Sequence, residues 1–165
     1  SVRVESALYL ITASGVSKGI MCRDDILLVD DRGRIREAAA GRQPSVESGM
    51  HVAVLQRNPA IGCVLHAHPV YATAFALSGA DLNACAPEAL QLNLGYVPIL
   101  PYAPAGSLEL AQQTAQALQT HCAVLLARHG AVTCGENITQ ALLRMETLEQ
   151  AAKTAYIGQR LCAQE

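Results

Sequence analysis

Residues 61–69 read Ile-Gly-Cys-Val-Leu-His-Ala-His-Pro, an apolar run that ends in two histidines and a proline. The run predicts a buried strand, and a helix is expected to begin directly after it, at about Pro69. Side chains two residues apart on a strand point to the same face, so His66 and His68 converge while Ala67 points away. Two converging imidazoles predict either a metal site or a hydrogen-bonded pair of histidines at a strand end.

The rest of the chain predicts alternating strands and helices around this run. Alternation and hairpin turn residues predict strands at 7–12, 25–30 and 34–37, and apolar runs predict strands at 123–127 and 131–134. Helices are expected from Ser45, as N-cap, to about Arg57, from 69 to about 78, from 107 to about 120, and from 137 onward. Mixed elements with hairpin signals predict a single α/β domain over residues 1–165, with an at least partly antiparallel sheet.

Composition excludes several functional classes. Hydrophobic residues make up 51% and charged residues 16%, with a net charge of −2, which argues against disorder and against a nucleic-acid partner. No apolar stretch approaches the roughly twenty residues that a membrane span needs, so no membrane partner is expected. Ser-Val-Arg-Val-Glu-Ser at the N-terminus is unlike a secretory signal, which predicts a cytoplasmic protein. The low charge also suggests that copies of the chain cover part of its surface.

The six cysteines are not expected to carry the chemistry. No two of them lie within four residues of each other, so the spacing of a zinc ribbon is missing. Apolar neighbours, as around Cys63 and Cys122, predict buried reduced thiols.

His129 and Glu47 extend the two converging histidines into a candidate catalytic site. His129 also follows a buried strand and precedes a glycine, so it can face the same cleft. Three neutral imidazoles around a divalent ion leave positions open to substrate, as in catalytic metal sites. Glu47 would supply an acid/base group from a buried helix face that it shares with Met50; the alternative is a first-turn glutamate stabilised by the helix dipole.

Motifs along the whole chain resemble those of the class II aldolase/adducin family, the group that contains the fuculose-1-phosphate aldolases. In the first half these are Pro44-Ser45-Val46-Glu47, Met50-His51, Arg57-Asn58-Pro59, His66-Ala67-His68-Pro69 and Tyr71-Ala72-Thr73. In the second half they are Pro98, Pro101-Tyr102, Gly106, Glu109-Leu110-Ala111, Leu125-Leu126, His129-Gly130, Gly135, Ala141 and Glu149.

The resemblance implies a three-layer α/β/α fold with a mainly antiparallel central sheet, assembled as a homotetramer with sites at subunit interfaces. It implies that His66, His68 and His129 bind a divalent metal, zinc first and manganese, cobalt or nickel as alternatives, and that Glu47 is the catalytic acid/base. The implied activity is that of a lyase that cleaves a small ketose or ketose phosphate through a metal-stabilised enediolate.

Departures from the family pattern concern the substrate. The resemblance implies that Ser14, Gly15 and Ser45 bind a phosphate, but Val46 stands where a second serine is expected and offers no hydrogen bond. The family's N-terminal helix and Gly-Asn loop do not precede Ser1, and no tyrosine stands near Glu88, which is expected to be an exposed helix-start residue. Epimerisation at C4, dehydration, sugar-acid decarboxylation and a non-catalytic adducin-like interaction module therefore stay open as alternatives.

Overall fold

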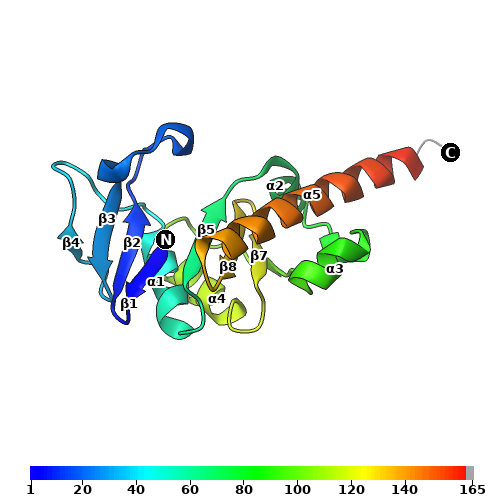
Figure 1. The fold of residues 1–165 in the computed structure, drawn as a ribbon. Coiled ribbons are helices and arrows are strands. Elements are labelled where there is room, and N and C mark those ends of the chain that lie inside the picture. The colour runs from blue at the N-terminus through cyan, green and yellow to red at the C-terminus, as the bar shows by residue number, and fades with distance from the viewer. Residues whose placement is uncertain (163–165) are drawn as a thin grey trace.

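The computed structural model describes residues 1–162 and has one sheet that contains eight strands (Figure 1). The strands are β1 Val2–Glu5, β2 Leu8–Thr12, β3 Ile26–Asp30, β4 Ile35–Glu37, β5 Cys63–Ala67, β6 Ile99–Leu100, β7 Ala123–Leu126 and β8 Gly130–Gly135. Their order is β4-β3-β2-β1-β5-β8-β7-β6, and neighbours are antiparallel except β6 and β7. The predicted, mainly antiparallel sheet is confirmed.

Helices connect and cover these strands. The α-helices are α1 Ser48–Arg57, α2 Val70–Ser78, α3 Glu88–Leu94, α4 Leu108–Ala117 and α5 Ile138–Cys162, and short 3₁₀ helices occupy Lys18–Ile20, Arg23–Asp25 and Leu82–Ala84. In the part of the chain that the structure describes, no helix combines the length and apolar character needed to cross a bilayer.

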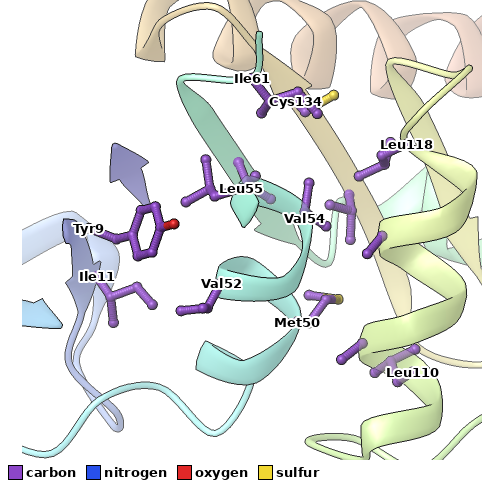
Figure 2. Packing of buried hydrophobic residues seen from close by; sticks show 14 of the residues in the cluster. Tyr9, Ile11, Met50, Val52, Val54, Leu55, Ile61, Leu110, Leu118 and Cys134 are labelled. Atoms are coloured by element: carbon purple, nitrogen blue, oxygen red, sulfur yellow. The ribbon is translucent and has the colours of Figure 1, made fainter. Parts of the chain in front are cut away.

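The helices form one layer on each face of the sheet. On one face, α1 packs against α4 (Figure 2). The core beneath them includes Leu55 and Val124. On the other face, α2 and α3 pack against α5, over a second core that includes Leu125 and Leu148. Val124 and Leu125 are consecutive in β7 and enter different cores because strand side chains alternate between faces. The implied three-layer α/β/α fold is therefore confirmed.

Two predicted helix boundaries are wrong, and turn hydrogen bonds explain both. The helix expected from Ser45 begins at Ser48, because the Ser45 hydroxyl accepts from the Glu47 N–H at 3.3 Å and its carbonyl accepts from the Ser48 N–H at 2.9 Å. Glu47 is consequently the N-cap residue and not a helical one. The helix expected to reach about Thr120 ends at Ala117, where the hydrogen bonds tighten to a three-residue spacing.

The strand β1, the two-residue strand β6, the helix α3 and the short 3₁₀ helices were not predicted as such. β1 is short and half-exposed, and it carries charged residues, so its alternation is weak. α3 begins at Glu88, which is exposed as expected, but its seven residues are too few for a clear helical periodicity.

The six cysteines are all free, and their exposure divides them into three groups. Cys63 and Cys134 are buried as expected, Cys85 and Cys122 are half-buried, and Cys22 and Cys162 are exposed, which corrects the prediction for the last four. Burial raises the pKa of the Cys63, Cys122 and Cys134 thiols, that of Cys134 to about 12. These three side chains are therefore neutral thiols near pH 7.

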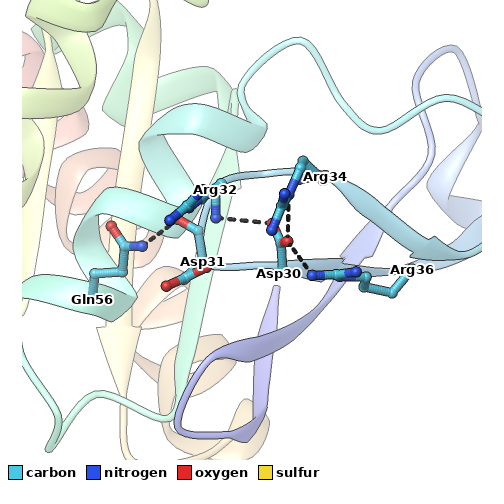
Figure 3. Close-up of polar contacts among 6 residues, drawn as sticks. All are labelled: Asp30, Asp31, Arg32, Arg34, Arg36 and Gln56. Carbon is cyan, nitrogen blue, oxygen red and sulfur yellow. Dashed lines mark hydrogen bonds and ion pairs between the residues drawn. The ribbon is translucent and has the colours of Figure 1, made fainter.

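The turn between β3 and β4 is organised by the carboxylate of Asp30 (Figure 3). Oδ1 accepts hydrogen bonds from the backbone N–H groups of Arg32 and Arg34, each at 2.9 Å. Oδ2 faces the guanidinium groups of Arg34 at 2.7 Å and Arg36 at 2.9 Å. Burial alone would raise the pKa of Asp30, but the hydrogen bonds and charge of Arg34, with the N–H of Arg32, outweigh it and lower the pKa from 3.8 to about 2.

We expect Asp30→Asn to lower the melting temperature at neutral pH. The melting temperature of this variant should also fall less steeply than that of wild type as the pH is lowered. The folded-state pKa lies below the unfolded value, so the stabilisation is complete above pH 3.8 and is lost as the pH falls toward about 2. Thermal unfolding followed by circular dichroism across this range measures the effect. Asp31→Asn, at the exposed neighbouring position, is the matched control. Equal acid sensitivity of wild type and Asp30→Asn would contradict the prediction.

Candidate functional site

The structure brings the three predicted histidines together from two neighbouring strands. His66 lies in β5, His68 follows the end of β5, and His129 directly precedes β8. Their ring centroids are 4.9 Å apart for His66 with either partner and 5.1 Å apart for His68 and His129. One nitrogen atom from each ring lies within 4.8 Å of the other two. This spacing is compatible with one ion held by three imidazoles.

A backbone carbonyl selects the tautomer of the neutral His66 ring. Nδ1 of His66 lies 3.0 Å from the carbonyl oxygen of Ala131 in β8. Because a carbonyl oxygen only accepts hydrogen bonds, Nδ1 carries the proton and Nε2 keeps the lone pair that a metal requires. Metal-binding histidines usually donate their other ring N–H to such an acceptor.

A glycine lets the two histidine-bearing segments approach each other. A Cβ atom at position 130 would lie 2.5 Å from Cδ2 of His68 and 2.7 Å from the carbonyl oxygen of Ala67. Neither distance is possible for a real side chain, and the carbonyl belongs to a strand that cannot move aside. Gly130 is therefore required for the close packing of His68 against the start of β8.

His68 and His129 both have surroundings that suit a metal ligand. Partial burial lowers the pKa of His68, the neighbouring His129 lowers it further, and Glu47 partly opposes both effects. Nδ1 of His129 is buried and lacks a hydrogen-bond partner, which is costly unless a ligand or solvent satisfies it. The donor chemistry of the three rings thus fits a divalent cation such as zinc.

Glu47 lies beside the histidines and is 7% exposed. Its Oε1 is 4.0 Å from Nε2 of His129 and accepts a hydrogen bond from the backbone N–H of Gly106 at 3.1 Å. Its Oε2 is buried without a hydrogen-bond partner. One carboxylate oxygen is therefore held in place by the backbone, and the other has no hydrogen-bond partner among the described residues.

The residue that holds Glu47 had to be a glycine. Gly106 has φ +72°, and a Cβ there would lie 2.9 Å from Cγ1 of Val46 and 3.1 Å from its carbonyl oxygen. Gly106 is one of the motif residues of the sequence, but neither its contact with Glu47 nor that of Ala131 with His66 could be predicted, because both use backbone atoms. A glycine before a helix was the one available signal.

The three residues expected to bind phosphate lie along two paired segments that lead to Glu47. The Ser14 N–H donates to the carbonyl of Gln43 at 2.9 Å, and the Ser45 N–H donates to that of Thr12 at 3.1 Å. Gly15 follows with φ +70° and open space around it. Ser14 and Gly15 are exposed and Ser45 is half-buried, with its hydroxyl oxygen bonded to the Glu47 N–H.

Comparison with known proteins relates this arrangement to one family. The model of the class II aldolase and adducin N-terminal domain matches residues 1–156. An L-fuculose phosphate aldolase of Methanococcus maripaludis strain S2 is 34% identical over 161 residues, which are 98% of this chain and 85% of that relative. A 3-oxo-tetronate 4-phosphate decarboxylase of Escherichia coli K12 is 37% identical over 125 residues, covering 73% of this chain and 59% of the relative.

Solved structures agree with these relatives. The crystal structure of L-fuculose-1-phosphate aldolase from Thermus thermophilus matches 99% of this chain and 83% of its own, with a TM-score of 0.83 and 33% identity. The relatives named here are enzymes. The chain therefore belongs to the class II aldolase and adducin family and is an enzyme, as its motifs predicted.

Proposed function

We propose that this enzyme is a divalent-metal-dependent lyase that cleaves a small ketose or ketose phosphate by a retro-aldol reaction, as its fuculose-phosphate aldolase relatives are named to do. The observation that carries the proposal is the meeting of three imidazole nitrogens, all within 4.8 Å of one another, with the buried carboxylate of Glu47. In this proposal His66, His68 and His129 hold the metal, with zinc as the first candidate. When bound, the metal would act as a Lewis acid that polarises the substrate's carbonyl group.

Glu47 is proposed as the acid/base group. In aldol cleavage a hydroxyl group loses its proton as it becomes a carbonyl, the adjacent C–C bond breaks, and its electron pair passes to the carbon next to the ketone. That carbon then takes up a proton, which balances the reaction. Oε2 of Glu47 is buried and unpartnered, while the Gly106 N–H holds Oε1, so the group is oriented to deliver this proton.

The substrate's anionic end is proposed to bind near Ser14, Gly15 and Ser45. Their segments are joined by backbone hydrogen bonds and lead directly to Glu47. Val46 presents an exposed apolar side chain between Ser45 and Glu47. We expect this valine to weaken phosphate binding, so unphosphorylated ketoses belong in any substrate screen.

Decarboxylation is the second candidate reaction. It is favoured by the 37% identity to the 3-oxo-tetronate 4-phosphate decarboxylase. Loss of carbon dioxide from a 3-oxo acid also leaves an electron pair on the carbon next to the ketone, which Glu47 would protonate in the same way. Product analysis separates the two reactions, since cleavage releases an aldehyde and decarboxylation releases carbon dioxide.

The assembly and location are part of the proposal. We propose a homotetramer, because α5 exposes Leu142, Leu143, Tyr156, Ile157 and Leu161 along its length. The six free cysteines support a cytoplasmic location, since reducing compartments keep thiols unpaired.

We expect the purified protein to carry about one divalent ion per chain and the double variant His66→Ala/His68→Ala to carry none. Removing two of three ligands leaves too few donors to retain an ion through dialysis. Elemental analysis of both proteins measures this, and His121→Ala is the matched control because His121 lies outside the histidine cluster. A native protein that takes up no added zinc or manganese would contradict the metal site.

Glu47→Gln should lower kcat by roughly 100- to 10,000-fold while the metal content stays unchanged. The amide oxygen can still accept the Gly106 hydrogen bond, but the amide cannot carry the proton. Turnover of L-fuculose 1-phosphate by metal-loaded enzyme tests this, with Glu37→Gln on the exposed strand β4 as control. Turnover by Glu47→Gln as fast as that of wild type would disprove the assigned role.

Sedimentation velocity at micromolar concentration should show a four-chain species. The exposed apolar side chains of α5 are expected to be buried between copies, so Leu143→Glu should shift the distribution toward smaller species. A wild-type protein that sediments only as a monomer would rule out the tetramer.

A further inference from the structure

The helix that follows His68 has no cap of its own. α2 begins at Val70, and its N-cap residue is Pro69, which has no side-chain group that can accept a hydrogen bond. The first backbone N–H groups of a helix lack partners within the helix and need acceptors from elsewhere. In most helices a serine, threonine, aspartate or asparagine at the N-cap supplies one.

A carboxylate from a distant helix takes over this role. Glu149 of α5 accepts hydrogen bonds from the N–H of Tyr71 through Oε1 at 3.0 Å and from the N–H of Ala72 through Oε2 at 2.9 Å. Both oxygens are thus used, and the negative charge lies at the positive end of the α2 dipole. These bonds connect positions 78 and 77 residues apart in the sequence.

No cation in the described part of the chain forms an ion pair with Glu149. The nearby Lys153 lies instead over the ring of Tyr71, 5.8 Å from its centroid. The Glu149 carboxylate is half-buried, so its charge is stabilised by the two backbone N–H groups. Both hydrogen bonds of the Glu149 side chain are formed with the first turn of α2.

The start of α2 determines where His68 lies, because only Pro69 separates the two and its ring fixes φ near −65°. His66 is oriented by its own hydrogen bond to the Ala131 carbonyl. His68 is the most exposed of the three histidines, and its ring contacts the other two rings but forms no such hydrogen bond to the backbone of the described residues. Its position therefore depends on the backbone that carries it.

We infer that Glu149 is a positioning residue for the metal site: by capping α2 it holds His68 in place to bind the ion together with His66 and His129. This inference rests on the proposed metal-binding function. Glu149 lies in the layer of α2 and α5, on the face of the sheet opposite α1 and α4. It would act on the site without contacting either metal or substrate.

The test compares Glu149→Gln and Glu149→Ala with wild type and with Glu146→Gln, a matched change at an exposed position of the same helix. Glutamine keeps the shape but has one acceptor oxygen in place of two, and alanine removes both. We expect zinc affinity, measured by competition with a chelator, to fall about 10- to 100-fold in Glu149→Ala and less in Glu149→Gln. The visible spectrum of the cobalt-loaded protein should change in both, and Glu146→Gln should match wild type.

A second measurement separates this inference from the metal proposal. In metal-free protein, NMR of the imidazole groups should show His68 shifted or broadened in Glu149→Gln, with His66 unchanged. If wild type bound no zinc, the metal proposal would fail, while this measurement would still decide whether Glu149 positions His68. Glu149 variants that unfold at lower temperature yet keep wild-type zinc affinity and wild-type His68 signals would show a merely structural cap and overturn the inference.

Discussion

The antiparallel pairing of β5 with β8 is the constraint on which the site depends. It places the end of one strand against the start of the other, with Ala67 opposite Ala131. The same pairing supplies the carbonyl that orients His66, and it needs a glycine at position 130 so that the backbones can meet. A shift of one residue in this register would turn His66 to the opposite face of the sheet. The core on both faces therefore protects the geometry of the site as well as the fold.

Both helical layers contribute to this strand junction. From one side, the segment before α1 brings Glu47, which Gly106 in the loop before α4 holds through its backbone N–H. From the other side, α5 holds the start of α2 through Glu149. The ends of two neighbouring strands carry the three histidines, and each layer fixes one of the groups around them. Rigid elements thus support the proposed metal ligands and Glu47, while loops farther away can vary with the substrate.

The sequence predicted those features that depend on local patterns. The two-residue period of a strand was sufficient to place His66 and His68 on one face, and the glycine after His129 marked the next strand end. It placed Glu47 on a helix, whereas the hydroxyl of Ser45 forms a turn that leaves Glu47 at the N-cap. The bonds of Glu149 were beyond prediction, because they join backbone groups more than seventy residues away and every residue but proline offers the same N–H.

The protonated, buried cysteines have a consequence for metal selection. Thiolate sulfur is a softer donor than imidazole and competes strongly for zinc, so a chain with six cysteines offers many wrong binding sites. A thiol must lose its proton before it can coordinate, and the raised pKa of Cys63, Cys122 and Cys134 opposes that loss. Burying these three sulfur atoms wholly or partly thus makes them poorer donors than the imidazole nitrogens of the proposed site. The protein's interior would in this way contribute to the metal selectivity of that site.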